Sequence, residues 1–190
     1  MLRDDVTALI LAGGKATRLG GVDKSSLVIE GRTIFERQVD VLRPCVAEII
    51  VSSPRVVPGY RTVVDPVPDV GPLAGIAAGL AASTTSWLFV IAGDMPHVHR
   101  AFIDLVMSRG DDESDAVGIR IGALPEPLCT MLRVAVWRPI VTDRIAKRRL
   151  KASSLLTDEE VRVRWIEEAE VRAIDPKLRA LHNVNVPADL

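Results

Sequence analysis

Short apolar segments of strand length alternate along this chain with segments whose apolar residues recur at helical spacing. Residues 87–92 are apolar throughout, which is typical of a strand buried on both faces of a parallel sheet. The alternation predicts a three-layer α/β/α fold with a mostly parallel, Rossmann-like central sheet. We expect a single domain over residues 1–190, because the chain is long enough for one domain and short for two. The predicted strands are residues 7–12, 48–52, 61–65, 87–92, 115–121, 128–134 and 161–165, and the predicted helices are residues 33–43, 71–83, 100–108 and 135–150.

Composition and charge argue against several classes of partner. The formal net charge is −1, whereas nucleic-acid binding depends on clustered excess positive charge. The basic run 144–151 is predicted to be a solvated helix face or a local anion contact. The low-polarity stretch 70–82 is too short to span a bilayer. Cys45 and Cys129 lie far apart in the sequence, so we expect two free thiols and a cytoplasmic protein. From the charge and the short apolar stretches, we expect no binding to nucleic acid or to a membrane.

A glycine-rich, cationic loop follows the first predicted strand. Residues 13–24 contain four glycines together with Lys15, Arg18 and Lys24. Glycines let backbone N–H groups approach a ligand closely, and the cations balance anionic oxygens, so the expected guest is a phosphorylated nucleotide. A Walker A loop is excluded because Asp23 precedes Lys24, and the dinucleotide fingerprint is excluded because its glycine spacing is absent. The alternative is a basic surface turn, which so many glycines and cations in one loop disfavour.

A carboxylate follows the apolar segment 87–92, in the order Gly-Asp-Met-Pro. Ligands bind at the carboxyl ends of strands in such sheets, so Asp94 is expected at the same edge as the glycine-rich loop. A carboxylate facing a triphosphate needs a cation between them, and Mg²⁺ is usually held by one or two carboxylates plus phosphates. The alternative is that Asp94 caps the next helix. His97 and His99 are weak evidence for zinc and are left unassigned.

Two further segments carry candidate binding groups. Small residues at the start of the helix over residues 71–83 leave room for a flat ring, although close helix–sheet packing explains such glycines as well, Gly79 above all. Asn183 and Asn185 are two residues apart in an extended segment, so their amides point the same way.

In this order, the four segments resemble the nucleotidyltransferases, and most closely the molybdenum cofactor guanylyltransferases of the MobA type. The pattern LAGG-x-x-x-R-x-G-G-x-DK is met at residues 11–24, GPLAG at 71–75, GD-x-P at 93–96, and N-x-N-x-P-x-DL at 183–190. Residues 127–129 also look like the family's PLC stretch, so the resemblance covers nearly the whole chain. The chain departs from the pattern at Leu19, where Met is usual, and at Ser52, where Asn is common.

The resemblance implies transfer of GMP from GTP to molybdenum-loaded molybdopterin, with release of pyrophosphate and with Mg²⁺ as cofactor. It implies catalytic roles for Arg18 and Lys24 at the phosphates and for Asp94 as the metal ligand, and it places Asn183 and Asn185 at the acceptor or the metal. Cofactor-insertion proteins or molybdoenzyme apoproteins are further candidate partners. The implied nucleotide-binding residues are Leu11, Ala12, Gly13, Gly14, Lys24, Asp65, Gly71, Pro72, Leu73, Gly75 and Asp94.

Three alternatives remain open at the level of sequence. A CTP-dependent molybdopterin cytidylyltransferase differs only in a few groups around residues 71–75. A sugar-1-phosphate nucleotidyltransferase is disfavoured by the short chain and by the pair of asparagines. A non-catalytic nucleotide-binding or carrier protein would not need Asp94 as a metal ligand.

Overall fold

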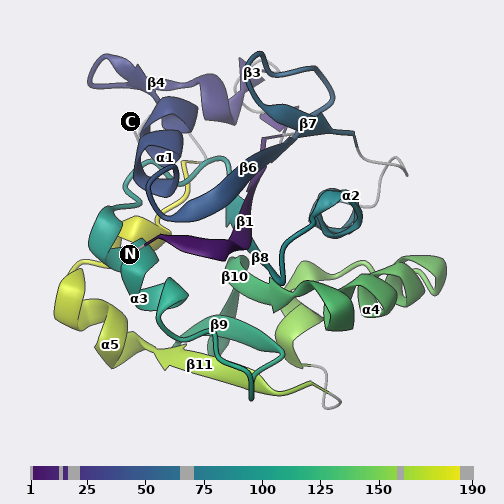
Figure 1. The fold of residues 1–190 in the computed structure, drawn as a ribbon. Coiled ribbons are helices and arrows are strands. Elements are labelled where there is room, and N and C mark those ends of the chain that lie inside the picture. The colour runs from purple at the N-terminus through teal and green to yellow at the C-terminus, as the bar shows by residue number, and fades with distance from the viewer. Residues whose placement is uncertain (1, 13–14, 17–21, 65–70, 158–160, 185–190) are drawn as a thin grey trace.

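A seven-stranded sheet forms the centre of the computed structural model, which describes residues 2–12, 15–16, 22–64, 71–157 and 161–184 (Figure 1). Its strands are β1 (Arg3–Leu11), β6 (Val46–Ser52), β7 (Arg61–Val63), β8 (Trp87–Ala92), β9 (Ala116–Ile121), β10 (Leu124–Arg133) and β11 (Val163–Glu167). They lie in the order β11-β9-β10-β8-β1-β6-β7. Only β10 runs antiparallel to its neighbours β8 and β9, whereas the other neighbouring pairs are parallel. The predicted mostly parallel sheet is therefore confirmed.

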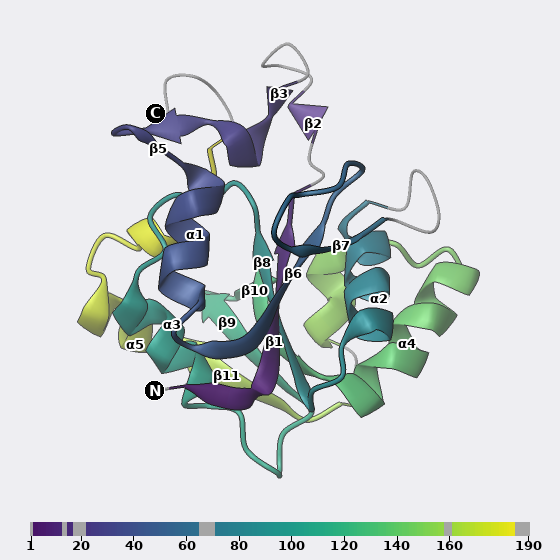
Figure 2. The ribbon, with the colours of Figure 1, turned by 45° about the horizontal axis from the view of Figure 1, so that its top comes forward.

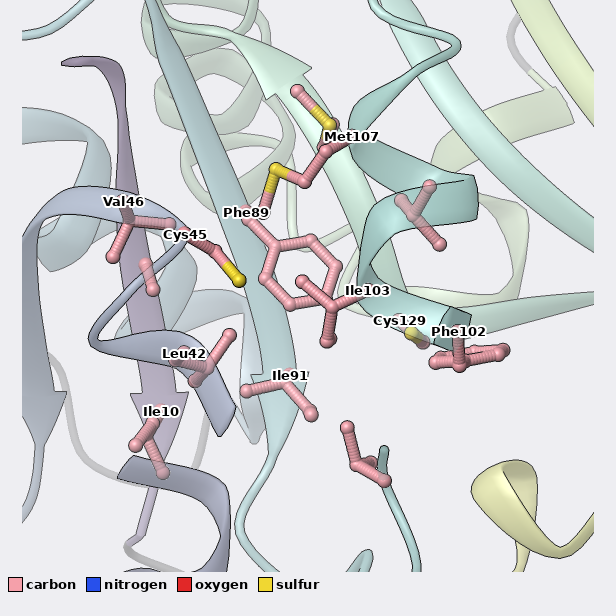
Figure 3. Packing of buried hydrophobic residues seen from close by; sticks show 14 of the residues in the cluster. Ile10, Leu42, Cys45, Val46, Phe89, Ile91, Phe102, Ile103, Met107 and Cys129 are labelled. Carbon is pink, nitrogen blue, oxygen red and sulfur yellow. The ribbon is translucent and has the colours of Figure 1, made fainter. Parts of the chain in front are cut away.

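Helices cover both faces of this sheet, which gives the three predicted layers (Figure 2). One face carries α1 (Ile34–Leu42), α3 (Arg100–Met107) and α5 (Glu168–Ile174), and the other carries α2 (Pro72–Ala82) and α4 (Val134–Ala146). Each face has its own buried apolar cluster. In the first, Phe89 and Ile91 of β8 point toward Ile103 of α3 (Figure 3). Alternate side chains of the central strands fill opposite clusters, as the strand period of two requires.

The local signals for two elements were reliable. Thr33 caps α1 with Glu36 as predicted: Glu36 N–H donates to Thr33 Oγ1 at 3.1 Å, and Thr33 N–H donates to Glu36 Oε2 at 2.8 Å. The strand predicted over residues 87–92 has the same bounds as β8. The predicted helix 135–150 is too long, because α4 ends at Ala146 and Arg148 takes a left-handed φ of 56°.

Two short hairpins lie on the side of the molecule where β1 ends, one near that end and the other over the start of α1 (Figure 2). The first pairs β2 (Lys15–Ala16) with β3 (Val22–Asp23), and the second pairs β4 (Val28–Ile29) with β5 (Arg32–Thr33). A short 3₁₀ turn, η2 (Lys24–Ser26), connects them. Two further 3₁₀ turns are η3 (Ala152–Thr157) and η4 (Arg179–Leu181). None of these elements was predicted from the sequence, which indicated only a glycine-rich loop over residues 13–24.

Three expectations from composition and charge can now be compared with the structure. The basic run 144–151 is not simply a solvated face, because Arg144 is buried and donates to Ser154 Oγ at 2.6 Å. Cys45 and Cys129 are both buried free thiols, as expected, and burial raises the pKa of each. Among the described helices, none combines the length and the apolar character needed to cross a bilayer.

Candidate active site

The ends of β1 and β8 approach each other so closely that only glycine fits between them. The two strands pair in parallel as far as Leu11 opposite Ala92, and Gly93 N–H then donates to the Leu11 carbonyl at 3.0 Å. A Cβ atom on Gly93 would lie 2.7 Å from that carbonyl oxygen. The glycine before Asp94 therefore allows the loop that carries the carboxylate to sit directly beside the end of β1.

Lys24 and Asp94 meet at this edge, although they come from segments far apart in the sequence. The β2–β3 hairpin returns the chain so that η2 begins with Lys24. Lys24 Nζ lies 2.9 Å from Asp94 Oδ2, and each side chain is 19% exposed. A cation and a carboxylate thus share one partly buried position at this edge of the sheet, and their roles toward a nucleotide stay predictions.

Asp94 does not cap the following helix, which was the alternative explanation for it. The N-cap of α3 is His99, whose Nδ1 accepts the Phe102 N–H at 3.4 Å. The Asp94 side chain remains directed to Lys24, while its backbone carbonyl accepts the Val184 N–H at 2.9 Å. Asn183 is exposed next to Val184, so Asn183 lies beside the Asp94 loop.

The start of α2 has the conformation and the packing that its small residues predict. Gly71 is the N-cap with φ of 69°, a left-handed value that favours glycine, and Pro72 follows at the first helical position. Leu73 is fully buried in the core under α2, so a nucleotide contact by this residue stays a prediction. Gly75 packs on the sheet, since a Cβ there would lie 2.6 Å from Ser52 Oγ.

Helix–sheet packing thus explains Gly75, and it explains Gly79 in the same way. A Cβ atom on Gly79 would lie 2.5 Å from Leu9 Cδ2. Ser52 is buried, and its backbone carbonyl accepts the Ala12 N–H at 2.8 Å, a bond that does not depend on the side chain. A nucleotide contact by Leu11, Ala12 or Gly75 stays a prediction.

Several predicted site residues lie outside the described part of the chain, and their roles stay predictions. They are Gly13, Gly14, Arg18, Asp65 and Asn185.

Sequence analysis missed a second carboxylate near Asp94. Glu126 lies near the start of β10, and the β8–β10 register brings Cys129 opposite Ile91, so the residues before Cys129 run toward the Asp94 loop. Burial raises the pKa of Glu126, and the negative charge of Asp94 raises it further. The only sequence signal is a glutamate between Pro125 and Pro127, which does not identify its neighbours.

A group of basic side chains lies beside the Asp94 loop on its α1 side. We call Arg37, His97, Arg179 and His182 the His97 cluster. Burial lowers the pKa of His97, and the positive charges of the other three members lower it further. Glu30 opposes these charges in part: its carboxylate raises the pKa of His97, and its Oε2 accepts a hydrogen bond from Arg37 at 2.8 Å.

Together with the family match given next, the sheet and the lysine and carboxylate that meet at the carboxyl ends of its central strands place the chain among the α/β nucleotidyltransferases. Residues 8–162 match the MobA-like NTP transferase domain, and the chain belongs to that family. A molybdenum cofactor guanylyltransferase of Desulfosudis oleivorans is 29% identical over 98% of this chain and 93% of its own length.

Solved structures show the same fold. The molybdopterin-guanine dinucleotide biosynthesis protein A of Archaeoglobus fulgidus superposes with a TM-score of 0.79 at 22% identity, covering 96% of this chain and 94% of that one. A Mycobacterium tuberculosis protein solved in complex with manganese has a TM-score of 0.60 at 17% identity, covering 86% and 88%.

Proposed function

We propose that this protein transfers GMP from GTP to molybdenum-loaded molybdopterin and releases pyrophosphate. The observation that carries this proposal is the 2.9 Å contact between Lys24 Nζ and Asp94 Oδ2, within the segment that matches the NTP transferase family. The choice of base and acceptor is supported by the name of the Desulfosudis relative, which aligns over 98% of this chain. We also propose that residues 1–190 act as one catalytic unit, and that the free thiols reflect a cytoplasmic location.

The chemical step requires charge neutralisation more than proton transfer. An oxygen of the acceptor's terminal phosphate attacks the α-phosphorus of GTP, and the bond from that phosphorus to the β-phosphate oxygen breaks, so that pyrophosphate leaves. The attacking oxygen is already anionic, so no side chain has to remove a proton from it. Alignment and preorganised positive charge therefore account for catalysis. We assign this charge to Lys24 and, from the sequence pattern, to Arg18.

Asp94 has the donor chemistry to hold Mg²⁺ together with the nucleotide. Within the described residues, no group of three or more His, Cys, Asp or Glu side chains could hold a metal ion. The carboxylate of Asp94 instead suits an ion that shares its coordination with substrate phosphates. Glu126 lies near enough to Asp94 for the charge of Asp94 to raise the pKa of Glu126. Bound there, Mg²⁺ would neutralise charge on the phosphates. The protein's own task is to hold the Asp94 oxygens at the edge of the sheet.

The acceptor is anionic, and the His97 cluster lies on the side from which we propose that it approaches. His97 follows Asp94 by three positions, and Arg179 and His182 are exposed. Asn183, which is exposed beside the Asp94 loop, is the proposed amide contact to the acceptor, together with Asn185.

Pyrophosphate release from the purified protein tests this proposal. We expect release with GTP, Mg²⁺ and molybdenum-loaded molybdopterin together, and none when any one of them is omitted. Release with CTP in place of GTP would identify a cytidylyltransferase instead. Release with a sugar 1-phosphate as acceptor would identify a sugar nucleotidyltransferase, and tight GTP binding without turnover would identify a carrier.

A further inference from the structure

A buried glutamine on α1 holds the loop that carries Asp94. Gln38 is 1% exposed. Its Nε2 donates to the Ala92 carbonyl at 2.8 Å and to the Met95 carbonyl at 3.1 Å. The Ala92 carbonyl precedes Gly93 and Asp94 in the chain, and the Met95 carbonyl follows them. One side-chain amide therefore binds the loop on both sides of Asp94.

Packing alone does not explain an amide at this position. The other buried residues of α1 are Ile34, Val39 and Leu42, all apolar, and an apolar side chain would suit the same space. Gln38 Oε1 has no hydrogen-bond partner among the described residues, although it is buried. A buried acceptor without a partner costs free energy. Turning the amide over would place Oε1 against two carbonyl oxygens, so the two donated bonds fix its orientation.

The same helix also anchors the segment that carries Lys24. Ile34 N–H, at the start of α1, donates to the Leu27 carbonyl at 3.0 Å, and Leu27 N–H donates to the Lys24 carbonyl at 3.2 Å. The first turn of α1 therefore holds the segment after η2, and the second turn of α1, through Gln38, holds the Asp94 loop. The spacing of the lysine and the carboxylate depends on this common support.

We infer that Gln38 is a positioning residue for Asp94: it fixes the carboxylate through the backbone of its loop, and so sets the affinity of the site for the nucleotide-bound divalent ion. The inference rests on the proposed role of Asp94. Groups that orient a metal ligand without touching the metal typically contribute 10- to 100-fold to metal affinity or activity. Because the two bonds that Gln38 donates go to backbone carbonyls, their loss should weaken metal binding without changing the ligand itself.

The test compares Gln38→Met, which keeps an unbranched side chain of similar length but has no donor, with the wild-type protein. Mn²⁺ binding in the presence of GTP is measured by electron paramagnetic resonance, alongside kcat and the KM for GTP. We expect the Kd for Mn²⁺ to rise about tenfold and kcat to fall by a similar factor. The affinity for GTP in the absence of metal should stay within about twofold.

Two other variants separate positioning from packing. Val39→Ala removes buried volume from the same helix but no hydrogen bond to the Asp94 loop, so it should lower the melting temperature and leave the Mn²⁺ affinity unchanged. Gln38→Glu keeps the size of the side chain and removes at least one donor, so it should weaken Mn²⁺ binding even if Gln38→Met fails to fold.

The outcomes distinguish this inference from the proposed function. Wild-type Mn²⁺ affinity and kcat in both Gln38 variants would overturn the positioning role and leave the function standing. A wild-type protein that turns over no GTP, but whose Gln38 variants bind Mn²⁺ more weakly, would overturn the function alone.

Discussion

The contact between Gly93 and the end of β1 allows a quantitative prediction. In Gly93→Ala, the new Cβ would lie 2.7 Å from the Leu11 carbonyl oxygen, whereas ordinary contact begins at 3.4 Å. Because the neighbour is backbone within a central strand, the Asp94 loop must move by about 0.7 Å, the difference between these two distances. A displacement of about 1 Å at a reacting group can cost 10²-fold in rate, so we expect kcat to fall by about 10- to 100-fold.

The assay is pyrophosphate release at saturating GTP and acceptor, with thermal denaturation measured in parallel. Strain from the added methyl group should lower the stability of Gly93→Ala by about 1–3 kcal/mol. The matched control is Gly79→Ala, whose Cβ would lie 2.5 Å from Leu9 Cδ2, the end of a side chain away from the site. This control should lose stability but keep the wild-type kcat. Wild-type turnover in Gly93→Ala, at enzyme concentrations where it is folded, would refute the reasoning.

Three further predictions concern charged groups. Lys24→Ala and Asp94→Ala should each lower kcat by about 10²–10³ with the circular dichroism spectrum unchanged, because each removes one preorganised charge from the site; near-normal turnover in either would contradict that residue's role. Arg179→Gln should raise the KM for the acceptor severalfold and leave the KM for GTP unchanged, and equal effects on both would argue against the His97 cluster as the acceptor side. The hydrogen bond and charge of Arg162 lower the pKa of Asp115 from 3.8 to about 2, so this pair stabilises the fold above pH 3.8 and its contribution is lost as the pH falls toward 2. We expect Arg162→Met to lower the stability at pH 7 and to have much less effect at pH 2, and equal losses by denaturant titration at both pH values would count against the linkage.

The elements that the sequence predicts well are those with a local signal. A capping box fixes the start of α1 because Thr33 and Glu36 are close in the chain. An uninterrupted apolar run gives β8 its bounds, because burial on both faces excludes polar side chains. The pattern around Asp94 places it at the carboxyl edge of the sheet, where the structure brings it to Lys24.

What the sequence could not supply depends on contacts between distant segments. The predicted strand 128–134 misses the first part of β10, because prolines at 125 and 127 argue against a strand, whereas pairing with β9 extends it to Leu124. In the sequence, nothing distinguishes Gln38 from the other polar residues of an amphipathic helix. Only the fold shows that its amide faces two backbone carbonyls of the Asp94 loop. Glu126 becomes a neighbour of Asp94 only once β10 is inserted beside β8.

The bond from Val184 N–H to the Asp94 carbonyl has a consequence for how the protein matures during synthesis. The two residues are far apart in the chain, so a nascent polypeptide can assemble β1, β6 and β8 on the ribosome before residue 184 has emerged from the exit tunnel. A chain interrupted before that point would retain its central strands but lack the last support of the Asp94 loop. Premature termination near this end is therefore expected to leave the loop of the proposed metal ligand without this hydrogen bond.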